Sequence, residues 1–379
     1  MKYMGSKRAM LRNGLGDLLD RELQSSRRFV DLFSGSAAVA NHVAQRSPVP
    51  VLAADLQEFS VALAAAVITR QEKLDWQPIW SSWFKRAEAE VIVAAPIRMT
   101  SSSLTERAVQ KQRAWSNECT TLPITKAYGG HYFSAEQAVW IDALRGTLPT
   151  ARDARRVALA ALIRSASHCA ASPGHTAQPF QPTPTGIKYL AEAWRRDLVE
   201  QTKKNFIFLA ETISLSRGEA KRGDANLLAK SLREGDLVFI DPPYSGVHYS
   251  RFYHVLESVA RGSCGDVEGR GRYPSAKRRP RSSYSVQTEA MTALDDLLGT
   301  IAARGSKVVL TFPAHPCSNG LSGALVQEIA AKHFRVTYKS VASRFSTMGG
   351  TSDNRGNQAG RSARKDAEEL ILRLDVRRA

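Results

Sequence analysis

The segment Asp236-Leu237-Val238-Phe239-Ile240-Asp241-Pro242-Pro243-Tyr244 joins a short apolar run to a stiff polar turn. A continuous apolar run of this length, ended by turn residues, predicts a strand buried on both faces, as in parallel sheets. The two prolines remove two backbone donors and restrict the turn. Because open α/β sheets bind ligands outside the carboxyl ends of their strands, we expect residues 241–244 to lie at a binding crevice.

Further apolar runs flank this segment on both sides. Residues 28–33 and 49–54 read as strands, each followed by a helix, with Asp55 directly after the second. Downstream, a helix over about 287–303 precedes an apolar run at 307–312. Two more runs, 334–341 and 369–374, suit an antiparallel pair at a sheet edge, separated by the polar stretch 343–366. The pattern predicts an α/β fold with a Rossmann-like sheet.

Residues 71–214 break this pattern, because strand-like runs become rare and every tryptophan of the chain lies here. Ser134 and Gln137 have the spacing of a capping box, which predicts a helix through about Leu144. Thr150 is the expected cap of an alanine-rich helix reaching about Ser172. The segment 173–186 contains four prolines and two glycines and is expected to be a loop. We interpret this region as a mainly helical insertion.

The composition favours a polyanionic partner. Lys and Arg number 53 against 36 Asp and Glu, a formal net charge of +17, which suits nucleic acid or an anionic membrane surface. No apolar run has the roughly 18 residues of a membrane span, and no apolar signal-peptide core follows Met1. The four cysteines form no CxxC pair, so a reducing, cytoplasmic location is expected.

The chemistry of residues 241–244 suits a planar base that bears an amino group. Asp241 and the Pro242 carbonyl are hydrogen-bond acceptors, and the Tyr244 ring can stack on a base. The alternative from the residues alone is a rigid loop that merely ends a strand and exposes a tyrosine.

Two other segments are candidates for ligand binding. In Asp31-Leu32-Phe33-Ser34-Gly35-Ser36, a strand ends in small residues that let the backbone approach a ligand closely. Asp31 there suits an ammonium group and Asp55 suits ribose hydroxyls, although an ordinary tight turn explains the same residues. The N-terminal segment from Lys2 to Leu11 is, by composition, a basic tail.

Together the three segments resemble the D12 class of adenine-N6 DNA methyltransferases, the group that includes the Dam enzymes. Lys2-Tyr3-x-Gly5-x-Lys7 resembles motif X of that family, residues 31–36 resemble motif I, and Asp241-Pro242-Pro243-Tyr244 resembles motif IV. Gly223-Asp224 resembles motif III. The order X, I, insertion, IV is that of the family's α group, and the resemblance covers about 1–70 and 215–379.

The resemblance implies an S-adenosyl-L-methionine-binding catalytic domain over 1–70 and 215–379, and a target-recognition insertion over 71–214. It implies that the cofactor contacts Tyr3, Lys7, Asp31, Phe33, Gly35, Ser36, Asp55 and Asp224. The chain departs from the family pattern at Ala37, where a second glycine is frequent, and at Ala225, where an aromatic residue is usual.

The resemblance also implies methylation of adenine N6 in DNA, by a catalytic set of Asp241, Pro242, Pro243 and Tyr244 and without a metal. The target adenine would be flipped out of double-stranded DNA. One alternative is amino methylation of cytosine N4 in DNA or of adenine in RNA, which use related tetrads. Another is a DNA-binding protein of the same fold that has lost catalysis, although the intact Asp241 and Tyr244 argue against it. The recognition sequence, the oligomeric state and a cognate restriction nuclease as partner are left open by the sequence, which carries no nuclease motif.

A basic segment follows the tetrad, with no acidic residue from 269 through 288. It is predicted to contact DNA phosphates rather than to be a solvated linker, through Arg270, Arg272, Lys277, Arg278, Arg279 and Arg281. Residues 251–254 suit either a wall of the base pocket or a helix that packs into the core. His168, Cys169 and His175 match the spacing of no common metal site.

Overall fold

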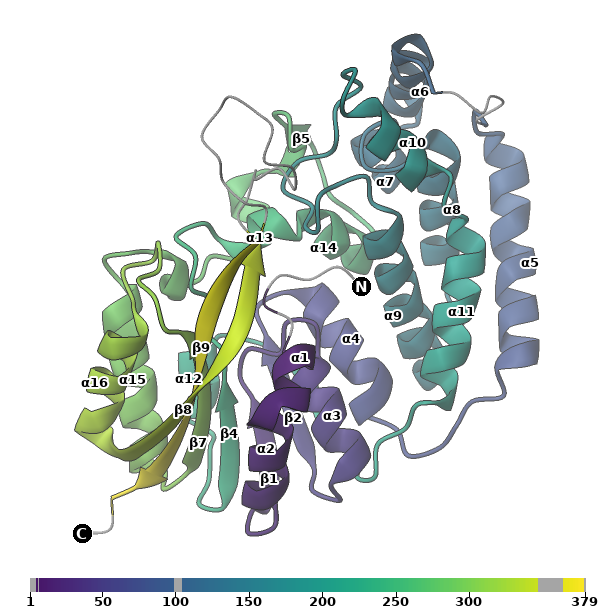
Figure 1. Ribbon diagram of the computed structural model, residues 1–379. Coiled ribbons are helices and arrows are strands. Elements are labelled where there is room, and N and C mark those ends of the chain that lie inside the picture. Colours follow the sequence, from purple (N-terminus) through teal and green to yellow (C-terminus); the bar gives the residue numbers. More distant parts are fainter. Residues whose placement is uncertain (1–4, 6, 99–103, 347–363, 378–379) are drawn as a thin grey trace. The chain divides into compact units, whose positions relative to one another are not determined.

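The computed structural model describes residues 5, 7–98, 104–346 and 364–377 (Figure 1). The chain divides into two compact units. Among the described residues, the sheet unit comprises 5–56, 215–249 and 281–377, and the helical unit comprises 57–214 and 250–280. None of the described helices has the length and apolarity that crossing a membrane requires.

The sheet unit is built on a mostly parallel sheet of seven strands in the order β3-β2-β1-β4-β7-β9-β8. The strands β1, β2, β3, β4 and β7 run parallel, and the antiparallel pair β8 and β9 completes one edge. Their bounds are β1 Arg28–Asp31, β2 Val51–Asp55, β3 Glu219–Arg222, β4 Asp236–Ile240, β7 Lys307–Pro313, β8 Phe334–Ser346 and β9 Arg364–Val376. The Rossmann-like sheet and the edge pair are therefore confirmed.

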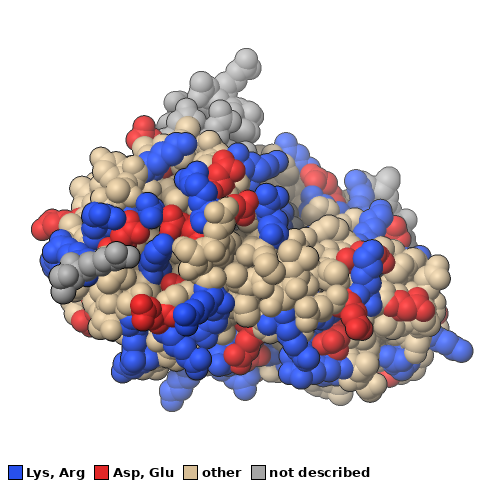
Figure 2. Space-filling model, turned by 90° about the horizontal axis from the view of Figure 1, so that it is seen from below, with Lys and Arg blue, Asp and Glu red and all other residues tan. Residues whose placement is uncertain are grey.

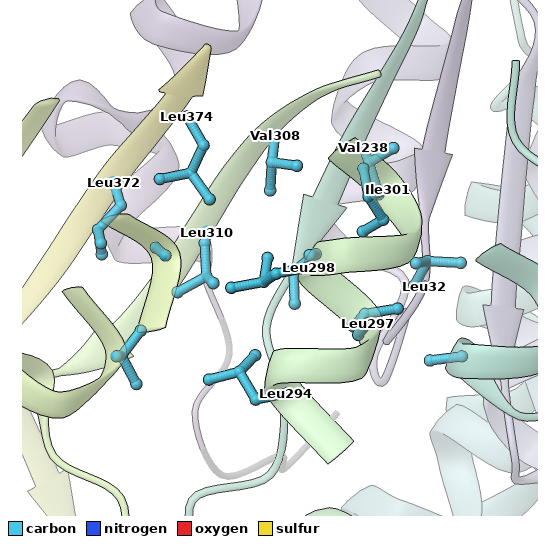
Figure 3. Close-up of a cluster of buried hydrophobic side chains, with 14 of the residues drawn as sticks. Leu32, Val238, Leu294, Leu297, Leu298, Ile301, Val308, Leu310, Leu372 and Leu374 are labelled. Atoms are coloured by element: carbon cyan, nitrogen blue, oxygen red, sulfur yellow. The ribbon is translucent and has the colours of Figure 1, made fainter. Parts of the chain in front are cut away.

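The sheet is covered by helices of the same unit. The helices are α1 Arg8–Met10, α2 Gly16–Leu23, α3 Ala38–Arg46, α12 Ala225–Ala229, α15 Ala290–Ala303 and α16 Gly323–His333, with an irregular turn η1 Leu11–Leu15 between α1 and α2 and a short η3 turn at Ser283–Ser285. In α15, Leu294, Leu297, Leu298 and Ile301 recur at helical spacing and point toward the strands (Figure 3). They meet buried side chains of the strands, among them Val238, Val308, Leu310, Leu372 and Leu374 (Figure 3).

The helical unit confirms the mainly helical insertion. It contains α4 Glu58–Ile68, α5 Trp76–Ala94, α6 Glu106–Glu118, α7 Pro123–Tyr128, α8 Ala135–Gly146, α9 Arg152–Cys169, α10 Ile187–Trp194, α11 Leu198–Glu211, α13 Tyr249–Phe252 (from its second residue on) and α14 His254–Arg261. A small hairpin, β5 Val267–Glu268 and β6 Tyr273–Pro274, follows, and η2 Ala276–Arg278 is a single turn. Trp80, Trp83 and Phe206 pack their rings together, and the Trp83 indole donates to the Leu144 carbonyl at 3.0 Å.

Local signals within this unit predict one helix start correctly and one incorrectly. Ser134 and Gln137 form the predicted capping box of α8. The predicted cap at Thr150 is wrong, because α9 begins at Arg152 with Ala151 as its N-cap and no side-chain hydrogen bond there. The segment 173–186 forms the predicted loop before α10.

The compact units differ from the predicted division of the chain at residues 57–70 and 250–280, which belong to the helical unit. The reason is packing: α4 lies against α9 and α14. The buried Glu257 carboxylate of α14 also accepts hydrogen bonds from the Glu58 and Phe59 amides at the start of α4, each at 3.1 Å. A carboxylate in that position accepts from the first amides of the helix and suits the helix dipole.

The positive charge is not gathered into one patch on the face of the molecule that Figure 2 shows. On the face shown in Figure 2, Lys and Arg side chains lie between Asp and Glu side chains rather than in one uniform patch. The net charge alone therefore does not single out a nucleic-acid contact on this face.

Candidate active site

Three aspartates meet at the carboxyl edge of the sheet because their strands are neighbours. Asp31 ends β1, Asp55 ends β2, and Asp241 follows β4, and β1 pairs with both β2 and β4. Parallel strands bring their carboxyl ends to the same edge. The sheet order thus brings together residues that lie up to 210 positions apart in the sequence.

Asp241 is held by side chains from two distant segments. Lys7 Nζ lies 2.9 Å from Asp241 Oδ1 and 3.1 Å from an oxygen of Glu369 on β9. The Thr311 hydroxyl on β7 donates to the same Oδ1 at 2.9 Å. Burial raises the pKa of Asp241, while the Lys7 ammonium opposes that rise. Burial would lower the pKa of Lys7, but its two carboxylate neighbours outweigh that effect and raise it.

Tyr244 lies against the N-terminal segment. An ideal Cβ on Gly5 would come within 3.1 Å of the Tyr244 hydroxyl, and Gly5 has a positive φ of 69°. A side chain at position 5 would therefore be both strained and crowded. The Tyr249 ring meets the Tyr244 ring edge-on, with centroids 6.3 Å apart. Burial raises the pKa of Tyr244, so the phenol stays neutral.

The turn after β1 is tight and its backbone is tied to β2. The Ser34 amide donates to the Ala54 carbonyl at 2.9 Å, and the Gly35 amide donates to Asp55 Oδ2 at 2.8 Å. Ser36 lies partly buried in this turn. Ala37, the N-cap of α3, adopts a left-handed conformation with φ of 58°, which costs about 1–2 kcal/mol for a residue with a Cβ. A glycine would avoid that cost. This explains why a glycine is frequent at this position in the family that the motifs resemble.

Aromatic and polar side chains continue the site beyond Phe33. The Tyr284 ring packs edge-on against Phe33 at 5.1 Å, and its hydroxyl donates to Asn226 Oδ1 at 2.7 Å. Asp224 caps α12 by accepting from the amides of Asn226 and Leu227 at 3.0 and 3.2 Å. The site thus includes Tyr284 and Asn226, which the sequence alone does not single out because neither lies in a recognisable motif.

The residues present fit a cofactor with a cationic group. Asp31 is 1% exposed, and its carboxylate accepts a hydrogen bond from the Phe33 amide at 3.2 Å. Burial, followed by the negative charges of Asp241 and Asp55, raises the pKa of Asp31 well above its usual value. A buried carboxylate among carboxylates is costly, and a positively charged ligand group would relieve that cost.

The residues predicted to bind the cofactor that the structure describes all belong to the sheet unit. They are Lys7, Asp31, Phe33, Gly35, Ser36, Asp55 and Asp224. Tyr3 lies outside the described residues.

The basic segment is a folded hairpin and loop, and its basic side chains differ in how they are engaged. Arg272 donates to the carbonyls of Ala127 and Lys126, and Arg279 donates to the Pro274 carbonyl at 3.0 Å. Arg281 pairs with Glu289. Arg270, Lys277 and Arg278 are exposed.

Two further candidates from the sequence belong to the helical unit. Phe252, Tyr253 and His254 are at most 2% exposed, which agrees with core packing. His175 packs against Phe252, and within the described ranges no group of three or more His, Cys, Asp or Glu is placed to hold a metal ion.

Two similar curated proteins are modification methylases. The chain is 25% identical over 315 residues to modification methylase StsI of Streptococcus sanguinis, covering 82% of this chain and 44% of that protein. It is also 25% identical over 312 residues to modification methylase LlaI of Lactococcus lactis subsp. lactis, covering 79% of this chain and 44% of that protein. The chain thus spans less than half the length of these relatives.

A family model matches more than half of the chain. It describes the D12 class N6 adenine-specific DNA methyltransferases, and the match covers residues 3–90 and 151–298. The matched ranges include the N-terminal segment, the turn after β1 and the Asp241–Tyr244 loop. The chain belongs to the D12 class of N6 adenine-specific DNA methyltransferases.

Proposed function

We propose that this chain transfers a methyl group from S-adenosyl-L-methionine to N6 of adenine in DNA. The observation that carries the proposal is the joint placement of Asp241 and Tyr244 beside the buried Asp31, at one edge of a methyltransferase-type sheet. Asp31 would hold the ammonium group of the cofactor, Asp55 the ribose, and the Phe33–Tyr284 side of the site its adenine ring. When bound, the cofactor supplies a methyl group activated by a sulfonium.

The chain's own residues would act mainly by positioning. The N6 lone pair of adenine is delocalised into the ring, so N6 is a weak nucleophile. Hydrogen bonds from N6 to Asp241 and to the Pro242 carbonyl favour a more tetrahedral nitrogen, and they act through preorganised acceptors. Tyr244 would stack on the flipped base, an interaction worth about 1–3 kcal/mol. No covalent intermediate on the protein is needed.

This function can be tested while the recognition sequence is still unknown. DNA from cells that express the chain is sequenced with detection of modified bases, and a second sample is digested to nucleosides. N6-methyladenine at a defined sequence, absent when an inactive variant is expressed, is the expected result. Detection of N4-methylcytosine would show that cytosine is the target, and methylation of RNA alone would show that RNA is the substrate. Cofactor binding without transfer to any nucleic acid would favour a DNA-binding protein without catalysis.

The helical unit is proposed to read the target sequence. The family model leaves residues 91–150 unmatched, a range that includes α6, α7 and α8. Base readout depends on a few side chains that differ among enzymes with different sites, whereas cofactor binding does not. A segment outside the family match, inserted between matched catalytic segments, suits that division of roles. A cytoplasmic location and a cognate nuclease would accompany a role in restriction and modification.

Arg270, Lys277 and Arg278 are proposed to contact DNA phosphates. Replacing all three with glutamine is expected to weaken binding to every DNA sequence alike, because phosphate contacts position the protein without reading bases. The slope of log affinity against log salt should fall by about 0.9 for each phosphate interaction that the substitutions remove, so by roughly 1 to 3 in total. Fluorescence anisotropy titrations at several salt concentrations measure this slope.

A matched control separates a local contact from a general loss of charge. Arg12, Lys230 and Arg304 are exposed on the sheet unit, and their replacement with glutamine removes the same charge elsewhere. That variant should keep a slope close to the wild-type value. Equal slopes for the two triple variants would show that the basic segment has no special role, and a changed methylation site would show that it reads bases.

A further inference from the structure

The acceptors of the Asp241–Tyr244 loop are not equivalent in the folded chain. Asp241 Oδ1 accepts from both Lys7 Nζ and the Thr311 hydroxyl, each at 2.9 Å. The Pro243 carbonyl accepts from Asn319 Nδ2 at 2.9 Å. By contrast, no described residue donates to Asp241 Oδ2 or to the Pro242 carbonyl.

Thr311 and Asn319 come from one segment, the end of β7 and the loop after it. Thr311 is fully buried, and its strand pairs with β4, which leads into Asp241. Asn319 is 1% exposed and is anchored in turn, because its Oδ1 accepts from the Leu321 amide at 3.2 Å. Both side chains therefore reach the loop from a rigid, buried support.

Asn319 also links the two halves of the site. The same Nδ2 that donates to the Pro243 carbonyl donates to the Tyr284 carbonyl at 3.0 Å. Tyr284 packs against Phe33 in the turn after β1. One amide group thus joins the loop that would face the target base to the aromatic residue beside the proposed cofactor site.

We propose that Thr311 and Asn319 are positioning residues that leave Asp241 Oδ2 and the Pro242 carbonyl as the pair of acceptors presented to the target amino group. This inference rests on the proposed function. A flipped base needs two acceptors at fixed positions, and a carboxylate that can rotate offers neither oxygen reliably. By hydrogen-bonding Oδ1, Thr311 fixes Oδ2 as the oxygen of Asp241 that would face the base. Asn319 hydrogen-bonds the Pro243 carbonyl, so that this carbonyl does not compete for the base, and it holds the loop in place.

The two residues should differ in their effect on pH dependence. Thr311 hydrogen-bonds the ionised form of Asp241, which lowers its pKa, whereas Asn319 contacts only carbonyls. The other titratable groups that face Asp241 are Lys7, Glu369, Asp31 and Tyr244, and the substitutions retain all of them. Without the Thr311 hydroxyl, Asp241 should become protonated at a higher pH. The acid limb of the pH–rate profile should therefore shift to higher pH.

The test compares the single-turnover methylation rates of variants of the whole chain. The substrate is unmethylated DNA that carries the target sequence. Thr311→Val, which keeps the shape and removes the hydroxyl, should lower the rate at neutral pH about tenfold and move the acid limb to higher pH. Thr311→Ser should restore both. Asn319→Leu has a similar size, adds no charge and removes the donor to the Pro243 and Tyr284 carbonyls, so it should lower the rate without moving the limb. Affinity for S-adenosyl-L-methionine, measured by calorimetry, should stay unchanged for the Thr311 variants.

Ser306→Ala is the matched control, since Ser306 is a fully buried hydroxyl just before β7 that donates to the Arg233 carbonyl at 3.0 Å. It should change neither rate nor pH profile. An unshifted limb in Thr311→Val, a failure of serine to rescue, or the same change in the control would overturn the inference. Thermal melts verify that each variant folds. If the Asn319 variant does not fold, the rate and pH profile of Thr311→Val decide the inference. A wild-type chain that methylates nothing would instead reject the proposed function itself.

Discussion

Replacing Asp241 with alanine is expected to lower the single-turnover rate of methyl transfer at least 100-fold while leaving S-adenosyl-L-methionine binding largely intact. Such a loss corresponds to about 2.7 kcal/mol or more of transition-state stabilisation. The reason is that, in the proposed function, Asp241 would supply the side-chain acceptor for N6, whereas Asp31 and Asp55 lie where the cofactor would bind. Rapid-quench assays give the rate, and calorimetry gives the cofactor affinity.

The structure also indicates how this variant should be controlled. Loss of Asp241 leaves the buried Lys7 with Glu369 as its carboxylate partner, at 3.1 Å, so thermal melts must accompany the rates. Asp241→Asn keeps the size and an acceptor oxygen but removes the charge. Asp17→Ala, at an exposed position on α2, is the matched control for loss of an aspartate and should be fully active. A folded Asp241→Ala variant that keeps more than about a tenth of the wild-type rate would remove Asp241 from its proposed role.

Replacing Asp31 with asparagine should weaken S-adenosyl-L-methionine binding about 10- to 100-fold, the cost of losing a charge-assisted contact to the cofactor ammonium. The same change should stabilise the cofactor-free protein, because Asp31 is a buried carboxyl near Asp55 and Asp241. The two effects have opposite signs. Calorimetry measures the affinity, and denaturant unfolding without cofactor measures the stability. Binding and stability that both fall would show a purely structural role.

The stability effect of Asp31 should depend on pH in a defined direction. Its pKa in the folded chain is raised, so the folded state binds the proton more tightly than the unfolded state does. Between the usual aspartate pKa and the raised value, stability should therefore fall as pH increases. The difference in unfolding free energy between Asp31→Asn and wild type should grow over that window and level off above it. A difference that is constant with pH would contradict a raised pKa at Asp31.

Much of the fold could be predicted from local sequence because its strands are short, continuous apolar runs. The run 236–240 became β4 with every residue buried, and 307–312 became β7. The one strand of the main sheet that was not predicted, Glu219–Arg222, lies at the sheet edge and is largely exposed. An exposed edge strand needs no apolar run, so hydrophobic pattern could not reveal it.

Local patterns in the chain were enough to establish the type of sheet, the helical insertion and the order of the motifs that identify the family. They did not identify Lys7 and Thr311 as the partners of Asp241, or Glu369 as the second partner of Lys7, because these residues lie 234, 70 and 128 positions away from Asp241 in the chain. The sheet order places β7, which carries Thr311, beside β4, and β9, which carries Glu369, beside β7, and Lys7 pairs with both Asp241 and Glu369. Folding therefore determines which oxygen of Asp241 accepts from Thr311 and which proline carbonyl accepts from Asn319. Strand pairing depends on contacts summed over the whole sheet, and no local pattern encodes it.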